Sequence, residues 1–99
     1  MMRRIFKYAV PVPAVTTSTI LTHRNPSFLS CAFQEDKLVV WAEVDLASSD
    51  EATDHPVIVA VIPTGGKVLR MIQFSYLGTA IHQTSGIVMH VYVDAKIKR

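Results

Sequence analysis

Histidines and carboxylates are the side chains of this chain that metal binding or acid–base catalysis would use. His82 and His90 fall on two neighbouring runs of a predicted hairpin, where their imidazoles can approach each other. A structural zinc takes four ligands, and no cysteine or carboxylate is obviously placed to complete this pair. His82 and His90 are therefore weak metal candidates, and a pair of half-exposed sheet histidines is the preferred interpretation.

Glu43 and Asp45 alternate on one face of a run with strand character. Two such carboxylates can serve as acid and base, but this chemistry usually needs a cleft and shifted pKa values. The sequence also lacks the glycine-rich phosphate loops, the nucleophile elbow and the H-E-x-x-H zinc motif. We therefore expect a non-enzymatic protein without a cofactor and with no catalytic residues. A small metal-dependent hydrolase using these carboxylates and the histidines is the least favoured reading.

Basic side chains collect at the two ends of the chain, whereas seven of the eight acidic residues lie between Glu35 and Asp54. If the last strand lies near the first, the two ends form one basic pole suited to an acidic protein surface, RNA or a phosphate-bearing ligand. The alternative is that charges collect at chain ends and loops because those are solvated. The candidate binding residues are Arg3, Arg4, Lys7, Lys96, Lys98 and Arg99.

Aromatic side chains stand on several of the apolar runs, and Tyr8 lies beside the basic residues Arg4 and Lys7. Trp41, Tyr8, Tyr76 and Tyr92 resemble in composition a stacking platform for bases, but ordinary core and cross-strand packing is the preferred reading. The single cysteine, Cys31, has apolar neighbours, which indicates a small buried hydrophobe rather than a nucleophile.

Short β-branched and aromatic runs separated by turn residues dominate the chain. The tight connection 35–37 predicts an antiparallel hairpin between its flanking runs, and 83–86 predicts a second. The segment 23–27 contains Asn-Pro and predicts a turn. The run 57–62 is apolar at every position, which suits a strand in the middle of a sheet or between two layers. The predicted strands are 4–10, 16–22, 28–34, 38–45, 57–62, 74–82 and 87–93.

The fold class that follows is mainly β, a single small domain over 1–99 built as an antiparallel β-sandwich or partly open barrel of six or seven strands. At most one short helix is expected near 67–73, where strand or irregular structure is favoured because the segment is short. We expect a mobile acidic loop at 46–55 and a charged basic tail at 94–99. Exposed sheet edges and modest size make a homodimer possible.

The chain shows no secretory signal, because Lys7 and two prolines interrupt the apolar stretch behind the first residues. No run approaches the roughly 20 apolar residues of a membrane span. We therefore expect no membrane partner and a location in the cytoplasm or in a particle assembled there.

Several short motifs resemble a family of small tailed-phage proteins of unknown function, which typically begin Met-x-Arg-Ile-Phe-Lys-Tyr. The motifs are the opening 4–8, the strand 40–45 with Trp-Ala-Glu-Val-Asp, the segment 76–79 and the closing strand around 90–92, and their order and spacing fit over most of the chain. Here Ala9-Val10-Pro11 stands where the family usually has Leu-Pro, and the tail is longer and more basic. The resemblance implies phage origin and a compact β-rich domain, and supplies no catalytic residues.

These observations together predict a phage-encoded accessory protein that acts by binding, with a host or phage protein or an acidic, phosphate-bearing ligand as partner. Such a protein would antagonise a host or defence protein or sequester a nucleotide signal in the host cytoplasm. The alternative is a structural protein of the virion, such as a decoration or tail accessory subunit.

Overall fold

Eight strands form the protein, and the computed structural model describes residues 2–11, 17–47, 51–68 and 74–98. These described residues contain no helix. Of the predicted helix-or-strand segment 67–73, residues 67–68 are irregular and 69–73 lie outside the described residues. The strands are β1 (Arg3–Val10), β2 (Thr17–Thr22), β3 (Arg24–Gln34), β4 (Lys37–Asp45), β5 (His55–Pro63), β6 (Ser75–Ile81), β7 (Val88–Val93) and β8 (Lys96–Ile97).

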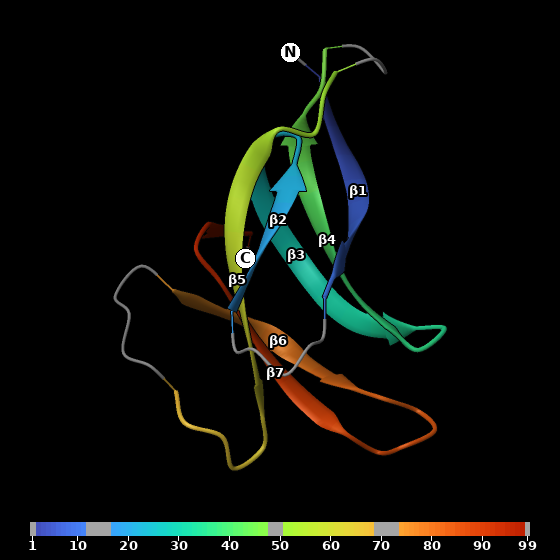
Figure 1. Ribbon diagram of the computed structural model, residues 1–99. Coiled ribbons are helices and arrows are strands. Elements are labelled where there is room, and N and C mark those ends of the chain that lie inside the picture. Colours follow the sequence, from blue (N-terminus) through green and yellow to red (C-terminus); the bar gives the residue numbers. More distant parts are fainter. Residues whose placement is uncertain (1, 12–16, 48–50, 69–73, 99) are drawn as a thin grey trace.

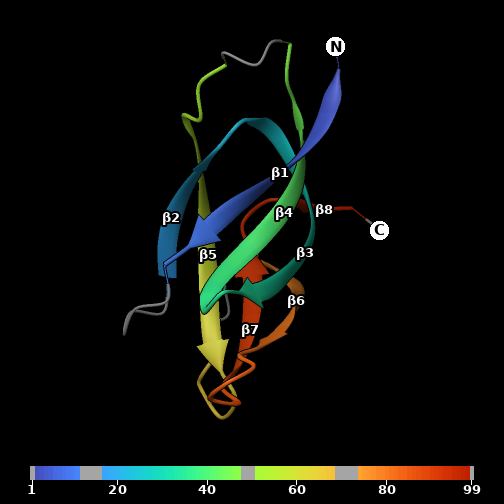
Figure 2. The same cartoon turned by 90° about the vertical axis from the view of Figure 1, so that its right-hand side faces the viewer.

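The strands pair into two four-stranded sheets (Figure 1, Figure 2). We call β1-β4-β3-β8 sheet A and β2-β5-β7-β6 sheet B. All pairings are antiparallel except the short parallel contact between β3 and β8. Of the predicted sandwich or partly open barrel, the sandwich is confirmed, and the described residues contain eight strands where six or seven were expected.

Both predicted hairpins are present. Gln34 pairs with Lys37 across a turn made by Glu35 and Asp36, whose φ angles are 49° and 65°. Two positive φ values in a two-residue loop are typical of the type I′ turn, whose twist matches that of the strands. The β6–β7 hairpin closes with Gly86 at φ 74°, which supplies the left-handed residue expected there.

Strand β3 departs from the predicted pattern at two irregularities in its pairing with β4. The predicted turn at 23–27 is mostly strand, because β3 begins at Arg24 and absorbs the left-handed Asn25 (φ 52°) within a bulge. A second shift between Phe28 and Ser30 places an extra residue in β3. This bulge reverses the alternation, so that Phe28 and Cys31 both face the interior although they are an odd number of residues apart.

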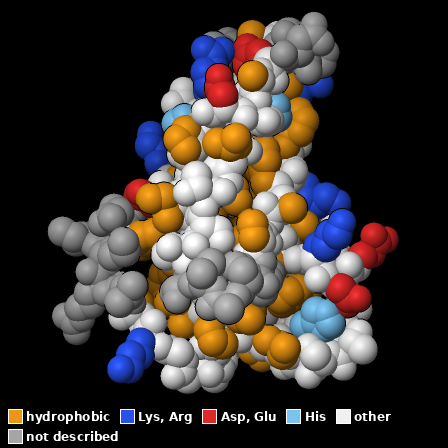
Figure 3. Space-filling view, viewed as in Figure 1, with side chains coloured by type: hydrophobic (Ala, Val, Ile, Leu, Met, Phe, Trp, Pro, Cys, Tyr) orange, Lys and Arg blue, Asp and Glu red, His pale blue; other side chains and the backbone are white. Residues whose placement is uncertain are grey.

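The core lies between the two sheets and consists mainly of aliphatic side chains. Apolar side chains also reach the surface (Figure 3), and the exposed large ones include Leu21 and Ile58. Strand β5 lies between β2 and β7, inside its sheet, as the apolar run 57–62 predicted. In β7, Val91 and Val93 face inward, as expected from their alternation. The largest fully buried apolar side chains are Phe28, Leu38, Val40, Val44, Val59, Val91 and Val93.

The predicted tail at 94–99 is partly a strand, because β8 pairs in parallel with β3 through Ser27–Lys96 and Phe28–Ile97. The backbone N–H of Lys98 continues this contact by donating to the carbonyl of Phe28 at 2.8 Å. The predicted loop at 46–55 begins with a buried Leu46 and ends where β5 starts, and its residues 48–50 lie outside the described ones. No helix in the described ranges is long and apolar enough to cross a membrane.

Candidate functional site

The outer face of sheet A carries basic side chains from both ends of the chain. Paired residues on neighbouring strands point to the same face of a sheet. Ile5 pairs with Glu43, Glu43 with Ser27, and Ser27 with Lys96, so one row crosses all four strands. Glu43 points outward because its neighbours Ala42 and Val44 are buried in the core.

Two further rows extend the same face. Arg3 pairs with Asp45, and Lys7 pairs with Trp41, the only tryptophan of the chain. Lys98 also reaches this face, since its ammonium group contacts the Glu43 carboxylate. We call this surface the charged face and define it by Arg3, Lys7, Trp41, Glu43, Asp45, Lys96 and Lys98.

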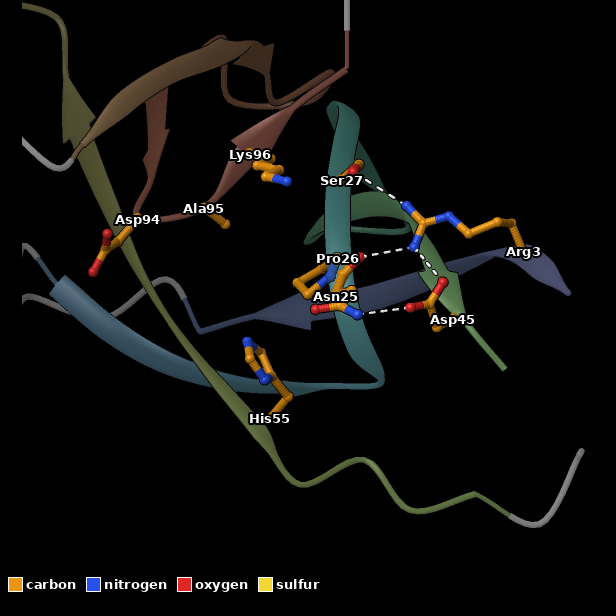
Figure 4. A pocket seen from close by; sticks show the side chains of 9 residues that line it. All are labelled: Arg3, Asn25, Pro26, Ser27, Asp45, His55, Asp94, Ala95 and Lys96. Carbon is orange, nitrogen blue, oxygen red and sulfur yellow. Dashed lines mark hydrogen bonds and ion pairs between the residues drawn. The ribbon is translucent and has the colours of Figure 1, made fainter. Parts of the chain in front are cut away.

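Arg3 leaves the edge strand and crosses β4 toward β3 (Figure 4). Its guanidinium group donates to Asp45 Oδ1 at 2.8 Å, to the carbonyl of Asn25 at 3.0 Å and to Ser27 Oγ at 3.2 Å. The Nε atom lies 3.5 Å from Glu43 Oε1. The hydrogen bond with Asp45 raises the pKa of Arg3. These contacts hold the guanidinium group against its own protein.

Both carboxylates of the charged face are ionised partners of cations. The hydrogen bond from Lys98, followed by the charges of Lys98 and Arg3, lowers the pKa of Glu43. The hydrogen bond from Asn25, followed by that from Arg3, lowers the pKa of Asp45. A general acid at neutral pH needs a raised pKa instead. The solvent-facing reading of Glu43 and Asp45 therefore fits the geometry, and Glu43 joins the two ends of the chain.

A groove of about 600 Å³ runs beside this network, over the bulged start of β3 (Figure 4). In Figure 4, Arg3 and Asp45 lie on one side of β3, and Lys96, Asp94 and His55 lie on the other. Lys96 forms no ion pair with any residue that the structure describes. The lining residues are Arg3, Asn25, Pro26, Ser27, Asp45, His55, Asp94, Ala95 and Lys96.

Lys7 has a neutral partner. Its ammonium group donates to Gln34 Oε1 at 3.0 Å, and within the described ranges no carboxylate pairs with it. Trp41 is only partly buried beside it on the outer face, and not in the core. Of the core and cross-strand packing preferred for the aromatic residues, Tyr8 shows core packing, and Tyr76 packs edge-on against Tyr92 across β6 and β7 with ring centroids 5.4 Å apart. Trp41 is not a core residue.

The structure brings four of the six predicted basic residues to the charged face, namely Arg3, Lys7, Lys96 and Lys98. Arg4 points to the opposite side of β1, where its Nε atom contacts Met2 Sδ at 3.3 Å. Arg99 lies outside the described residues. The two ends of the chain do not pair directly, because β4 and β3 separate β1 from β8.

The two histidines predicted as weak metal candidates are kept apart. His82 Nε2 lies 2.7 Å from Asp36 Oδ1, and its ring packs edge-on against Phe33. His90 instead bonds Thr64 and Thr79, both at 3.0 Å, on the outer face of sheet B. Among the described residues, no three metal-ligating side chains come together.

Cys31 is a packing residue in this fold. Burial raises the pKa of its thiol to about 11, so the nucleophilic thiolate is scarce at neutral pH. An added Cβ on Gly78 would lie 3.2 Å from Cys31 Sγ, which shows how closely β6 approaches β3 here. The inert reading of Cys31 therefore has a structural basis.

Sequence reasoning missed Asn25 and Ser27 as parts of the site, because the bulges of β3 that direct them to Arg3 leave no clear pattern. The outward position of Trp41 could have been predicted from the alternation of the strand. Trp41 lies two residues before Glu43 and four before Asp45, and both of these carboxylates are expected on the outer face.

Comparison with known proteins identifies a family for the whole chain. A family model described as a domain of unknown function matches residues 1–99, the whole chain. No curated protein and no solved structure matches the chain.

Proposed function

The chain belongs to the DUF7352 family, a domain of unknown function, and we propose that this protein acts by binding a partner through its charged face. In this proposal it is a phage-encoded accessory protein that performs no chemistry of its own. It antagonises a host or defence protein, or sequesters a nucleotide signal, in the host cytoplasm. The phage origin rests on the resemblance of its sequence motifs.

The observation that supports the proposal most strongly is the position of Trp41 beside basic residues on the outer face of sheet A. The only tryptophan lies on a solvent-facing sheet surface, directly paired with Lys7 and in the same face as Arg3. Tryptophan and arginine are enriched among the residues that dominate binding energies at protein interfaces. Aromatic faces with basic neighbours also suit stacked bases with phosphates.

The charges of the face divide into two groups. Arg3 and Lys98 are held by Glu43 and Asp45, which makes a preorganised frame. Lys7 and Lys96 have no carboxylate partner among the described residues. A partner carrying acidic or phosphate groups would supply the missing counter-charges, and complementary charges speed association.

Affinity purification from infected cells tests this proposal. The tagged protein is recovered beside a variant in which all six basic residues predicted from the sequence are neutralised, and co-purifying proteins and small molecules are identified by mass spectrometry. We expect a partner with the native protein and its loss with the variant, provided that circular dichroism shows both to be folded. Unchanged recovery of the same partner by the folded variant would refute the proposal.

A second candidate function is a structural subunit of the virion. The edge of β1, which is open among the described residues, supports it because such edges can pair with neighbouring subunits. Location separates the two proposals. Stoichiometric amounts in purified particles would favour the structural role. Presence in lysate alone would exclude it.

A further inference from the structure

The pairing of β1 with β4 determines which backbone groups of β1 face away from its sheet. The N–H of Leu46 donates to the carbonyl of Met2 at 3.0 Å, and the register of the two strands continues through this pair. In an antiparallel ladder, hydrogen-bonded pairs alternate with pairs that bond outward. The even-numbered residues of β1 therefore bond to β4. Arg3, Ile5, Lys7 and Ala9 direct their N–H and C=O groups to the free edge.

This edge is open in the described part of the protein. Within residues 2–11, 17–47, 51–68 and 74–98, β4 is the only strand that pairs with β1. Figures 1 and 2 show β1 as the outer strand of its sheet. All four residues that face the edge have exposed side chains, and Ile5 is 60% exposed.

We propose that β1 is a docking edge that accepts an extended acidic segment of a partner protein as an additional antiparallel strand of sheet A. Main-chain hydrogen bonds to Arg3, Ile5, Lys7 and Ala9 provide the attachment, as in other cases of strand addition. An apolar side chain of the segment lies opposite Ile5. An acidic side chain two positions away lies opposite Lys7. The recognised pattern is an acidic residue, any residue, then an apolar residue.

The charge of β1 is the reason for proposing an acidic partner segment. Strand β1 has three basic residues and no acidic one, and Lys7 has only the neutral Gln34 as a partner among the described side chains. Opposite charges directly across a strand pair stabilise it, and like charges destabilise it. An acidic residue at the position facing Lys7 is therefore favoured over a neutral or basic one.

The same rule disfavours a second copy of the chain. If Ile5 faces Ile5 of another copy in an antiparallel pair, Arg3 faces Lys7 twice. If Ile5 faces Lys7, Arg3 becomes the diagonal neighbour of Lys7 in the other copy, still within reach of long side chains. An acidic partner segment avoids the repulsion between Arg3 and Lys7 that arises in both of these registers.

Strand β1 contributes to both the charged face of the proposed function and the docking edge, so the tests must distinguish binding at these two places. The inference deepens the binding proposal by naming a partner class, but it uses the edge of sheet A and not the groove at Lys96. A Lys96→Glu variant reports on the groove, and a Lys7→Glu variant reports on the edge. Lys67→Glu, in the loop after β5, is the matched control for the same change of charge.

The test titrates the isotope-labelled full chain with the capped peptide Thr-Glu-Thr-Val-Thr-Glu-Thr, followed by NMR and calorimetry. The peptide is symmetric, so a Glu faces Lys7 whenever Val faces Ile5. We expect amide shifts concentrated at residues 3–9 and about tenfold weaker binding when both Glu residues are replaced by Lys. The Lys7→Glu variant should abolish this preference, because a carboxylate at position 7 opposes the attraction that remains at Arg3. Lys67→Glu and Lys96→Glu should keep it.

Backbone methylation distinguishes strand addition from simple charge attraction. Methylating the amide nitrogen of the central Val should abolish binding, because that N–H bonds to β1 in an antiparallel pair. Methylating the preceding Thr should leave binding intact, because its N–H points away. Equal binding of the two methylated peptides would overturn the proposal. So would shifts on sheet B, tighter binding of an oligouridine at residues 3–9, or shifts at these residues on raising the protein concentration alone.

Discussion

Replacing Tyr8 by phenylalanine removes a hydroxyl group that connects β1 to the corner between β2 and β3. The hydroxyl lies 2.6 Å from His23 Nδ1 and accepts from the backbone N–H of His23 at 3.3 Å. Tyr8 and His23 are 8% and 9% exposed, so water does not readily replace the lost partner. A buried polar group left without a partner costs about 1–3 kcal/mol. Because two groups are orphaned and the ring packing is retained, we expect a loss of roughly 2–3 kcal/mol.

Urea denaturation followed by circular dichroism measures this loss. The midpoint should fall while the slope stays unchanged, since the exposed area on unfolding is the same. A melting temperature roughly 10–20 °C lower should accompany it in a domain of this size. Tyr76→Phe is the matched control, because Tyr76 is 48% exposed and its hydroxyl bonds Thr79 at the surface. Its change should stay within about 0.5 kcal/mol. A loss for Tyr8→Phe no greater than that of the control would refute the reasoning.

Three further outcomes follow from packing and charge. Gly78→Ala should destabilise the fold by about 1 kcal/mol, because the added Cβ lies 3.2 Å from Cys31 Sγ; in urea denaturation the same substitution should cost less when it is made in a Cys31→Ala background, and an equal cost in both backgrounds would contradict the contact. The Cys31 thiol, with its pKa raised to about 11, should react with a disulfide reagent at pH near 8 only after denaturant is added; fast reaction of the native protein would contradict its burial. The lowered pKa values of Glu43 and Asp45 mean that their stabilising contribution is present above the ordinary carboxyl pKa of about 4 and is lost as the pH falls through the lowered values. Urea midpoints measured across that range should therefore fall less steeply for Lys98→Met, which removes the main cause of the Glu43 shift, and an identical slope would contradict the pairing.

Local patterns predicted much of the fold. The alternation in 38–45 and 87–93 assigned the core faces, and the turn residues at 35–37 and 83–86 located both hairpins, because each signal acts over a few residues. The bulges in β3 were not predictable in the same way. They depend on the pairing with β4, which left-handed Asn25 and the extra residue near Phe28 accommodate only in the folded sheet. The strand β8 was read as a charged tail for the same reason, since its pairing with β3 is long-range.

The candidate site was only partly predictable. The clustering of basic residues at the chain ends was visible in the sequence, and four of them reach one face. Their neutralisation by Glu43 and Asp45 was not visible, because it requires Arg3 to cross a whole strand. The sequence therefore overstated the free positive charge, and it is Lys7 and Lys96 that lack a carboxylate partner among the described residues.

Hydrogen–deuterium exchange on the complex recovered from infected cells tests the central claim most directly, which is that the charged face and its edge strand bind the partner. The account predicts slower exchange in the complex than in the free protein at residues 3–9 and 96–98, with little change on sheet B. Slowing confined to sheet B, or none at the two chain ends, would contradict it.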